Sequence, residues 1–246
     1  MARIKLTLAY DGTDFSGWQL QPRDRTVQGE VESALVRLVG GGVRVHGSGR
    51  TDAGVHALAQ VAHFDCPDDR AGLPWARALN AILPEDVRVT DAAVVDGEFH
   101  ARYSARSKTY EYVLWHDPGY CLPQRRRFVW DCGPVDFAAM EAAAGVFAGE
   151  HDFAAFRNLG TSVQSTVRTI FSLSRLPGGD ARESVWRFTA DGFLKQMVRN
   201  IMGALVACGR GRLAAADVRA ILRSRDRATA PATAPAQGLT LISLDY

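Results

Sequence analysis

Alternating apolar and polar residues predict most of the strands in this chain. Residues 3–9 place Ile4, Leu6 and Leu8 on one face and Arg3, Lys5 and other polar side chains on the opposite face. This is the pattern of a half-buried strand. The same alternation, or a run of β-branched residues, predicts further strands. They lie at residues 43–45, 60–64, 87–95, 108–114, 167–175, 184–190 and 239–245.

Apolar residues spaced three and four positions apart predict the helices. Thr26 can cap a helix whose apolar stripe starts at Val27, and Asp136 can cap another in the same way. A third helix is expected from Leu194, and Gly209 marks the place where it should end. Two shorter helices are expected at residues 75–82 and 214–222.

The order of these elements indicates the fold. The first hundred residues give strand, helix, strand, strand, helix, strand, which is the ferredoxin-like order. The rest of the chain repeats that order with a helical insertion. We therefore predict an α+β fold of two ferredoxin-like (RNP-like) βαββαβ halves, residues 1–104 and 105–246. Their sheets would join edge to edge into one extended, mainly antiparallel sheet, with helices on one face and a central cleft.

Length and composition are those of a soluble globular protein. The chain has 246 residues, of which 47% are hydrophobic and 23% charged, enough for two domains with real cores. No apolar run is long enough to span a membrane, and we expect no signal peptide before the first strand. The four cysteines show no paired spacing, which predicts free thiols and a cytoplasmic location.

The basic residues are nearly all arginines, although the formal net charge is only +2. The planar guanidinium suits phosphate and base recognition better than the lysine ammonium does. Arginines cluster at residues 23–25, 125–127 and 210–212, all in expected loops or turns. Each cluster alone is typical of a solvated surface, and together they point only weakly to a nucleic-acid partner.

Residues 46–56 form the most unusual stretch, because three glycines there surround Arg50, Thr51 and Asp52. A P-loop would need Lys-Ser/Thr after the last glycine, and a dinucleotide-binding loop would need a glycine at Asp52. The neighbouring histidines lack zinc-site spacing. From the residues alone, a catalytic carboxylate and a tight turn capped by Asp52 both remain open.

The stretch resembles the active-site motif of the tRNA pseudouridine synthase A family. Similar signatures stand in the same order elsewhere in the chain. They are Tyr-Asp-Gly at 10–12, Gly-Trp-Gln at 17–19, Thr-Val-Gln-Gly at 26–29 and Phe-His-Ala-Arg at 99–102. The resemblance implies an isomerase that converts uridine to pseudouridine at positions 38, 39 and 40 of the tRNA anticodon stem-loop. It also implies a homodimer in which one tRNA spans both subunits, and the reaction needs no metal or organic cofactor.

The resemblance also implies roles for five residues. Asp52, in the first half, would be the nucleophile, and Arg50 would enter the space left by the flipped base. In the second half, which completes the active site, Arg199 would pair with Asp52 and keep it ionised in its pocket. Tyr110 would stack on the uracil and help to remove the C5 proton. Leu239 would form a pocket wall.

Two other functions are weighed against this one. A non-catalytic RNA-binding protein with two RNP-like sheets would stack bases on strand aromatics, yet the chain has no RNP1-like run. A glycosidase or nucleosidase using Asp52 would need a second acid, and no carboxylate lies close to Asp52 in sequence. Without the resemblance, Tyr110 is an ordinary strand aromatic and Arg199 a solvent-facing helix residue.

Overall fold

The alternating residues at the start of the chain form strand β1, Ala2–Tyr10, in the computed structural model, which describes residues 1–158, 160 and 163–246. Ile4, Leu6 and Leu8 are fully buried, whereas the residues between them stay partly exposed. Strands β3 (His56–Cys66) and β4 (Val87–Val95) pair with β1 on either side, both antiparallel. The predicted half-buried strand is therefore confirmed.

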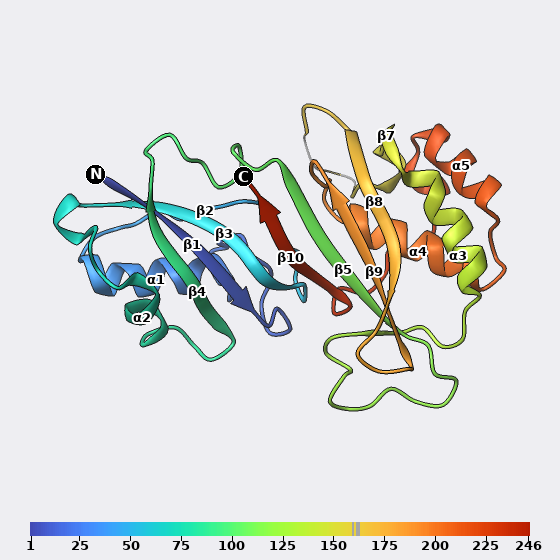
Figure 1. Ribbon diagram of the computed structural model, residues 1–246, viewed down its shortest axis with the longest axis horizontal. Coiled ribbons are helices and arrows are strands. Elements are labelled where there is room, and N and C mark those ends of the chain that lie inside the picture. The colour runs from blue at the N-terminus through green and yellow to red at the C-terminus, as the bar shows by residue number, and fades with distance from the viewer. Residues whose placement is uncertain (159, 161–162) are drawn as a thin grey trace. The chain divides into compact units, whose positions relative to one another are not determined.

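The chain divides into two units, and the first comprises Met1–Arg106 together with Thr240–Tyr246. Its strands follow the order β4-β1-β3-β10 (Figure 1), with β10 (Leu239–Asp245) parallel to β3 and the short β2 (His46–Gly47) antiparallel to it. Helix α1 (Val27–Val39) lies beside α2 (Trp75–Asn80). The ring of Trp75 packs edge-on against Phe64. Phe64 is paired with Ile4 on the neighbouring strand, so α2 covers the buried face of the sheet.

The second unit comprises Ser107–Leu239, and its strands follow the order β5-β9-β8-β7, all antiparallel. These strands are β5 (Ser107–Trp115), β7 (Gly149–Asp152), β8 (Val167–Pro177) and β9 (Glu183–Ala190), and the short β6 (Trp130–Asp131) pairs with β5. The helices are α3 (Phe137–Ala144), α4 (Met197–Gly209) and α5 (Ala215–Ser224). Helix α3 packs against both α4 and α5 (Figure 1).

The prediction of a strand at residues 43–45 was wrong, because side chains of α1, and not a neighbouring strand, bind the backbone of Val45. Its N–H donates to Glu32 Oε1 at 2.9 Å, and Gln28 Nε2 donates to its carbonyl at 3.1 Å. Both polar backbone groups are thereby satisfied without a sheet partner. Only the two-residue β2 remains before the Asp52 loop.

Other boundaries agree more closely with the pattern. The helix expected from Leu194 begins at Met197, because Gln196 adopts a left-handed conformation with φ 62° that a right-handed helix cannot contain. The residue-26 and residue-136 caps are confirmed, since both side chains accept hydrogen bonds from the first turns of α1 and α3. The four-residue β7 was missed because so short a segment shows no period.

Both units combine helices with mainly antiparallel strands, so the predicted α+β class is confirmed. The expected halves, residues 1–104 and 105–246, differ from the observed units mainly in residues 240–246. This segment pairs with β3 and belongs to the first unit. Within the described part of the chain, no helix has the length and apolar character needed to cross a membrane.

Candidate active site

The loop that joins β2 to β3 directs its charged side chains outward and its hydroxyls inward. Arg50 is exposed and Asp52 is partly exposed, whereas Ser48 and Thr51 are buried. The two charged residues of the motif can therefore meet a substrate. The buried hydroxyls are available to hold the loop on the rest of the unit.

A buried hydrogen-bond network supports this loop from below. The hydroxyls of Tyr10 and Thr51 share a hydrogen bond of 2.9 Å. Gln60 is fully buried; it accepts the Ser48 hydroxyl at 2.6 Å and donates to the Gly49 carbonyl at 3.0 Å. Burial raises the pKa of the Tyr10 phenol above its usual value, so this hydroxyl keeps its proton to higher pH than an exposed tyrosine does. Such buried, satisfied networks fix a loop in one conformation.

Two glycines, Gly12 and Gly17, let the backbone of residues 12–18 pack closely against the loop. A Cβ on Gly12 would lie 2.0 Å from the carbonyl oxygen of Val55, and a Cβ on Gly17 would lie 2.6 Å from that of Thr51. Gly17 also has a φ of +93°, which side-chain-bearing residues rarely adopt. The next residue, Trp18, donates its N–H to the Thr51 carbonyl at 3.1 Å. The loop and residues 12–18 therefore fit together through their backbones.

Arg50 is oriented by a chain of amide side chains. Its Nε donates to Gln19 Oε1 at 3.0 Å, and Gln19 Nε2 donates to Gln28 Oε1 at 2.8 Å. Gln28, buried in α1, donates in turn to Glu32 Oε1 at 2.8 Å. Neither glutamine was predicted to serve the site, although both stand in the signatures at 17–19 and 26–29. These bonds hold the exposed guanidinium in place without burying it.

The histidines near the loop are engaged elsewhere in the fold. His56 Nδ1 accepts the Gly12 N–H at 3.0 Å. The rings of His46 and His63 stack with their centroids 5.1 Å apart, and His63 Nδ1 accepts the Ala101 N–H at 3.2 Å. Burial, together with neighbouring positive charge, lowers the pKa of His63 to about 4. His63 is consequently neutral over the physiological range.

In the second unit, Tyr110 lies on β5 with its ring nearly buried, at 9% exposure. Its ring meets that of Phe193 edge-on, at 5.2 Å between centroids and 87° between planes. Phe193 precedes α4, in the stretch that contains Arg199. The contact therefore fixes the Tyr110 ring against the segment that leads into the helix carrying the predicted arginine.

Arg199 and the segment before β10 hold each other in place. The Arg199 Nε donates to the Ala234 carbonyl at 2.8 Å, and the Ala234 N–H donates to the Arg199 carbonyl at 3.1 Å. The Tyr112 hydroxyl donates to the Pro235 carbonyl at 2.6 Å, and a Cβ on Gly238 would lie 2.6 Å from the Tyr112 ring. Leu239 follows at the start of β10 and is 6% exposed.

A buried asparagine that sequence reasoning missed completes these connections. Asn200 has no exposed surface; its Nδ2 donates to the Phe156 carbonyl at 2.8 Å. Its Oδ1 accepts the Thr233 hydroxyl at 2.6 Å and Arg227 at 3.1 Å. The only signal in the sequence was a polar residue on the apolar side of a helix. Asn200 ties α4 to the segment that leads to Leu239.

The predicted site residues thus form two groups. Asp52 and Arg50 share one anchored loop in the first unit. Tyr110, Arg199 and Leu239 belong to the second unit, where hydrogen bonds and ring contacts connect β5, α4 and the segment before β10. The first group offers a carboxylate and an exposed cation, and the second offers an aromatic ring, a cation and an apolar wall.

Comparison with known proteins shows the family to which this chain is similar. A family model described as tRNA pseudouridine synthase matches residues 7–104 and 143–246. The tRNA pseudouridine synthase A of Solidesulfovibrio magneticus is 61% identical over 251 residues, covering 100% of this chain and 92% of that protein. The protein of the same name from Maridesulfovibrio salexigens is 55% identical and covers 100% and 91%. That from Geobacillus kaustophilus is 43% identical and covers 99% and 94%.

Among solved structures, that of an archaeal box H/ACA sRNP Nop10-Cbf5 complex is similar over 82% of this chain and 43% of that chain, with 15% identity and a TM-score of 0.37. The sequence relatives are far closer, and this chain covers more than nine-tenths of each of the three named above. The family model also matches most of the chain. The chain therefore belongs to the tRNA pseudouridine synthase family, whose members are isomerases.

Proposed function

We propose that this enzyme isomerises uridine to pseudouridine at positions 38, 39 and 40 of the tRNA anticodon stem-loop, with Asp52 as the nucleophile. The relatives' shared name, tRNA pseudouridine synthase A, supports the substrate class. One observation carries the role of Asp52. Its carboxylate is partly exposed on a loop held by buried hydrogen bonds and by backbone contacts with two glycines.

The reaction needs no second reactant, because uridine and pseudouridine are isomers. The Asp52 carboxylate adds to the nucleotide, and the bond between ribose C1′ and uracil N1 breaks. The base turns within the pocket, and a bond forms between C1′ and C5. C5 then loses its proton, N1 gains one, and the carboxylate leaves unchanged. Within this scheme, Asp52 must be ionised when the substrate arrives.

Arg199 keeps Asp52 ionised in this proposal. A carboxylate that enters a pocket loses solvation, which favours its neutral form, whereas an arginine about 4 Å away stabilises the anion by roughly 4 kcal/mol near a protein surface. The hydrogen bond from Arg199 Nε to Ala234 supports this role, because it orients the guanidinium. Removing Arg199 should therefore reduce turnover far more than tRNA affinity.

Arg50, Tyr110 and Leu239 act on the base. Arg50 enters the helical stack as the uridine leaves it; unstacking costs a few kcal/mol, and Arg50 gives up only an exposed hydrogen bond to Gln19, worth about 1 kcal/mol. Tyr110 stacks on the detached uracil and helps to remove the C5 proton. Leu239 forms the apolar wall of the pocket. The nearly buried positions of Tyr110 and Leu239 support these assignments.

The same proposal includes the finer architecture and the assembly. The units are two ferredoxin-like halves whose sheets join edge to edge and leave a central cleft for the anticodon stem-loop. The antiparallel order β4-β1-β3 with β2 beside β3, and the order β5-β9-β8 in the second unit, support this. The enzyme acts in the cytoplasm as a homodimer, with one tRNA spanning both subunits.

Mapping pseudouridine in unmodified tRNA at nucleotide resolution tests the proposed function. Wild type should convert uridines at positions 38, 39 and 40 and leave other uridines unchanged. Asp52→Ala should bind the same tRNA and make no product, whereas Asp24→Ala, at an exposed aspartate of the same unit, should act like wild type. Release of free uracil would indicate a glycosidase, and binding without product by wild type would indicate a simple RNA-binding protein. Either result would overturn the proposal.

A further inference from the structure

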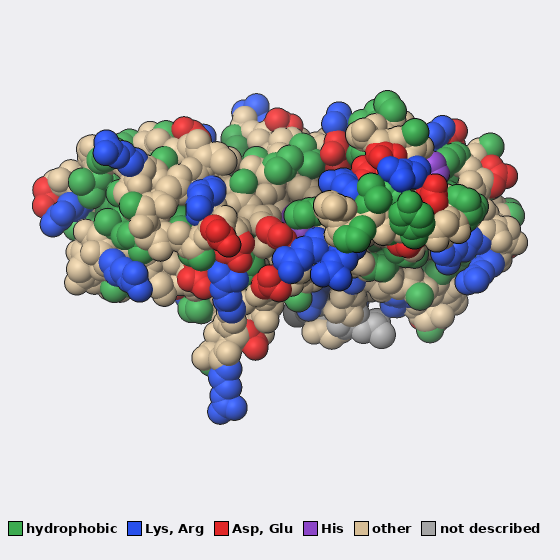
Figure 2. Space-filling model, turned by 90° about the horizontal axis from the view of Figure 1, so that it is seen from below, with side chains coloured by type: hydrophobic (Ala, Val, Ile, Leu, Met, Phe, Trp, Pro, Cys, Tyr) green, Lys and Arg blue, Asp and Glu red, His purple; other side chains and the backbone are tan. Residues whose placement is uncertain are grey.

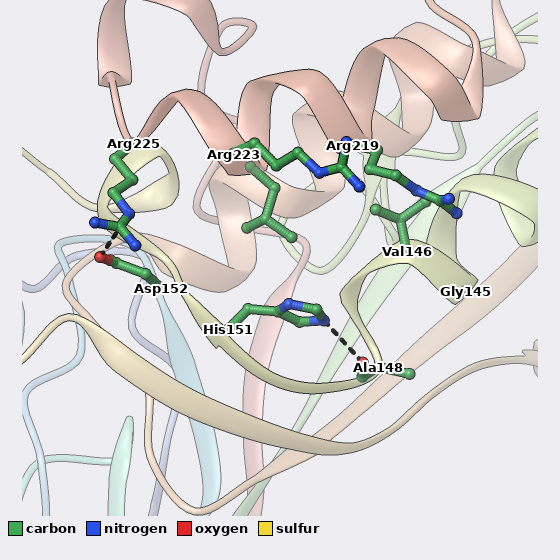
Figure 3. A pocket seen from close by; sticks show the side chains of 9 residues that line it. Gly145, Val146, Ala148, His151, Asp152, Arg219, Arg223 and Arg225 are labelled. Atoms are coloured by element: carbon green, nitrogen blue, oxygen red, sulfur yellow. Dashed lines mark hydrogen bonds and ion pairs between the residues drawn. The ribbon is translucent and has the colours of Figure 1, made fainter.

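A hollow on the second unit is lined by arginines. It has a volume of about 640 Å³ and lies between α5, β7 and residues 145–148. Figure 3 shows the side chains of Arg219 and Arg223 extending from α5 along one side, with His151 and Asp152 of β7 on the other. None of these residues takes part in the site proposed above.

Two of the arginines have no acidic partner among the residues that the structure describes. Arg219 and Arg223 are four residues apart on α5, so their side chains leave the same face of the helix. Across the described chain, no carboxylate forms an ion pair with either guanidinium. On the face drawn in Figure 2, by contrast, several basic side chains lie next to acidic ones. Two unpaired like charges side by side favour an anion between them.

The single carboxylate of the hollow is already engaged. Asp152 Oδ2 lies 3.2 Å from Arg225 Nε, and its Oδ1 accepts the Thr166 hydroxyl at 2.6 Å and the Ala154 N–H at 3.0 Å. Three arginines against one aspartate leave the lining with a formal charge of +2 when His151 is neutral. The hollow therefore favours an anionic occupant.

The other lining groups indicate which anion fits. His151 is the only ring among the described lining residues, and its Nε2 donates to the Ala148 carbonyl at 2.9 Å. The described lining holds no second aromatic ring to sandwich a free nucleotide base, and no asparagine or glutamine to read an adenine edge. Arginine, however, binds phosphate through paired N–H groups. Such a lining fits sequence-independent contact with a nucleic-acid backbone.

We propose that this hollow binds the phosphodiester backbone of tRNA, with Arg219 and Arg223 as the contacting residues. The inference rests on the proposed function, since that function supplies the tRNA. The contact adds affinity away from the reacting uridine. It therefore affects how tightly tRNA is held and leaves the rate of the bound complex unchanged.

The test measures the salt dependence of tRNA binding by the full chain. Arg219→Gln/Arg223→Gln should raise Kd about tenfold and reduce the slope of log K against log salt by about 1 to 2, since each released phosphate contact contributes about 0.9. Turnover at saturating tRNA should equal that of wild type. Arg219→Lys/Arg223→Lys keeps both charges and should retain most of the slope.

The matched control is Arg175→Gln/Arg182→Gln. It removes the same two charges from the same unit, but from guanidiniums already paired with Glu141 at 2.6 Å and Asp180 at 2.7 Å. Its slope should match that of wild type. An unchanged slope in the Arg219/Arg223 variant, or an equal change in the control, would overturn the inference. Tight binding of free ATP by wild type but not by the Arg219/Arg223 variant would also overturn it, because that result would indicate a small-molecule site. If pseudouridine forms while the slope is unchanged, only this inference fails.

Discussion

Replacing Gly17 with alanine should slow catalysis by moving the Asp52 loop. An added Cβ would lie 2.6 Å from the Thr51 carbonyl oxygen, and real Cβ atoms essentially never come closer than 3.0 Å to such a neighbour. The Thr51 carbonyl must therefore move by about 0.4 Å or more. Asp52 is the next residue, so its carboxylate moves as well. A displacement of about 1 Å can reduce turnover about 100-fold, and we expect kcat to fall about 10- to 100-fold.

Gly40→Ala is the matched control for this change. Gly40 also has a positive φ, of +75°, as the C-cap of α1, but an added Cβ there meets no atom within 4 Å. A side chain in the left-handed region costs about 1–2 kcal/mol, so Gly40→Ala should lose about that much free energy of unfolding and Gly17→Ala somewhat more, because its Cβ also meets the Thr51 carbonyl. Only Gly17→Ala should also lose turnover, because only its Cβ displaces the loop.

The assay for this comparison is pseudouridine formed per enzyme at saturating tRNA, together with urea unfolding of each variant. We expect a folded Gly17→Ala protein with low kcat and nearly unchanged KM. If Gly17→Ala and Gly40→Ala turned over at rates within twofold of each other, the position of the Asp52 loop would not limit the reaction. That outcome would refute the reasoning.

Three further changes probe other parts of the molecule. Arg50→Ala should lower kcat about 100-fold and leave the Kd for tRNA within a few-fold of wild type, because the variant loses the side chain that replaces the flipped base, a step that costs a few kcal/mol. Stopped-flow binding and turnover assays measure the two effects separately. Tyr112→Phe leaves the Pro235 carbonyl without its 2.6 Å donor and should lower the free energy of unfolding in urea by about 1–2 kcal/mol. The pKa of His63 in the folded protein is about 4, below its usual value. Between about pH 6.5 and pH 4 the unfolded chain therefore binds a proton at His63 that the folded chain does not. The stability that neutral His63 contributes is complete above about pH 6.5 and is lost as the pH falls toward 4. At pH 5 this loss should be about 2 kcal/mol; His63→Gln should remove it, and equal pH profiles for the two proteins would contradict the assignment.

Much of the fold follows from local pattern. Alternating apolar and polar residues predict β1 and β4, and helical spacing together with a capping side chain predicts the starts of α1 and α3. The strand expected at residues 43–45 failed because Glu32 and Gln28, far from it in sequence, bind the Val45 backbone. A pattern confined to a few neighbouring residues cannot carry that information.

The site was predictable in part for a similar reason. Asp52 and Arg50 stand in a charged, glycine-rich loop, which marks them as candidates from the sequence alone. Gln19 and Gln60 carry no charge and lie apart in sequence, yet they orient Arg50 and support the loop. Asn200 also carries no charge, and its role is to connect Phe156 to Thr233 through hydrogen bonds. Neutral amides gain these roles only once the chain has folded.

The most direct measurement of the role of Asp52 is single-turnover release of tritium from C5 of uridine in unmodified tRNA. Enzyme in excess over tRNA removes any effect of product release, and Asp52→Asn keeps the size of the side chain while removing its charge. Wild type should release the label as pseudouridine forms. Asp52→Asn should bind the tRNA equally well and release no more label than tRNA without enzyme. Release by Asp52→Asn at a rate within tenfold of wild type would contradict the assignment of Asp52 as the nucleophile.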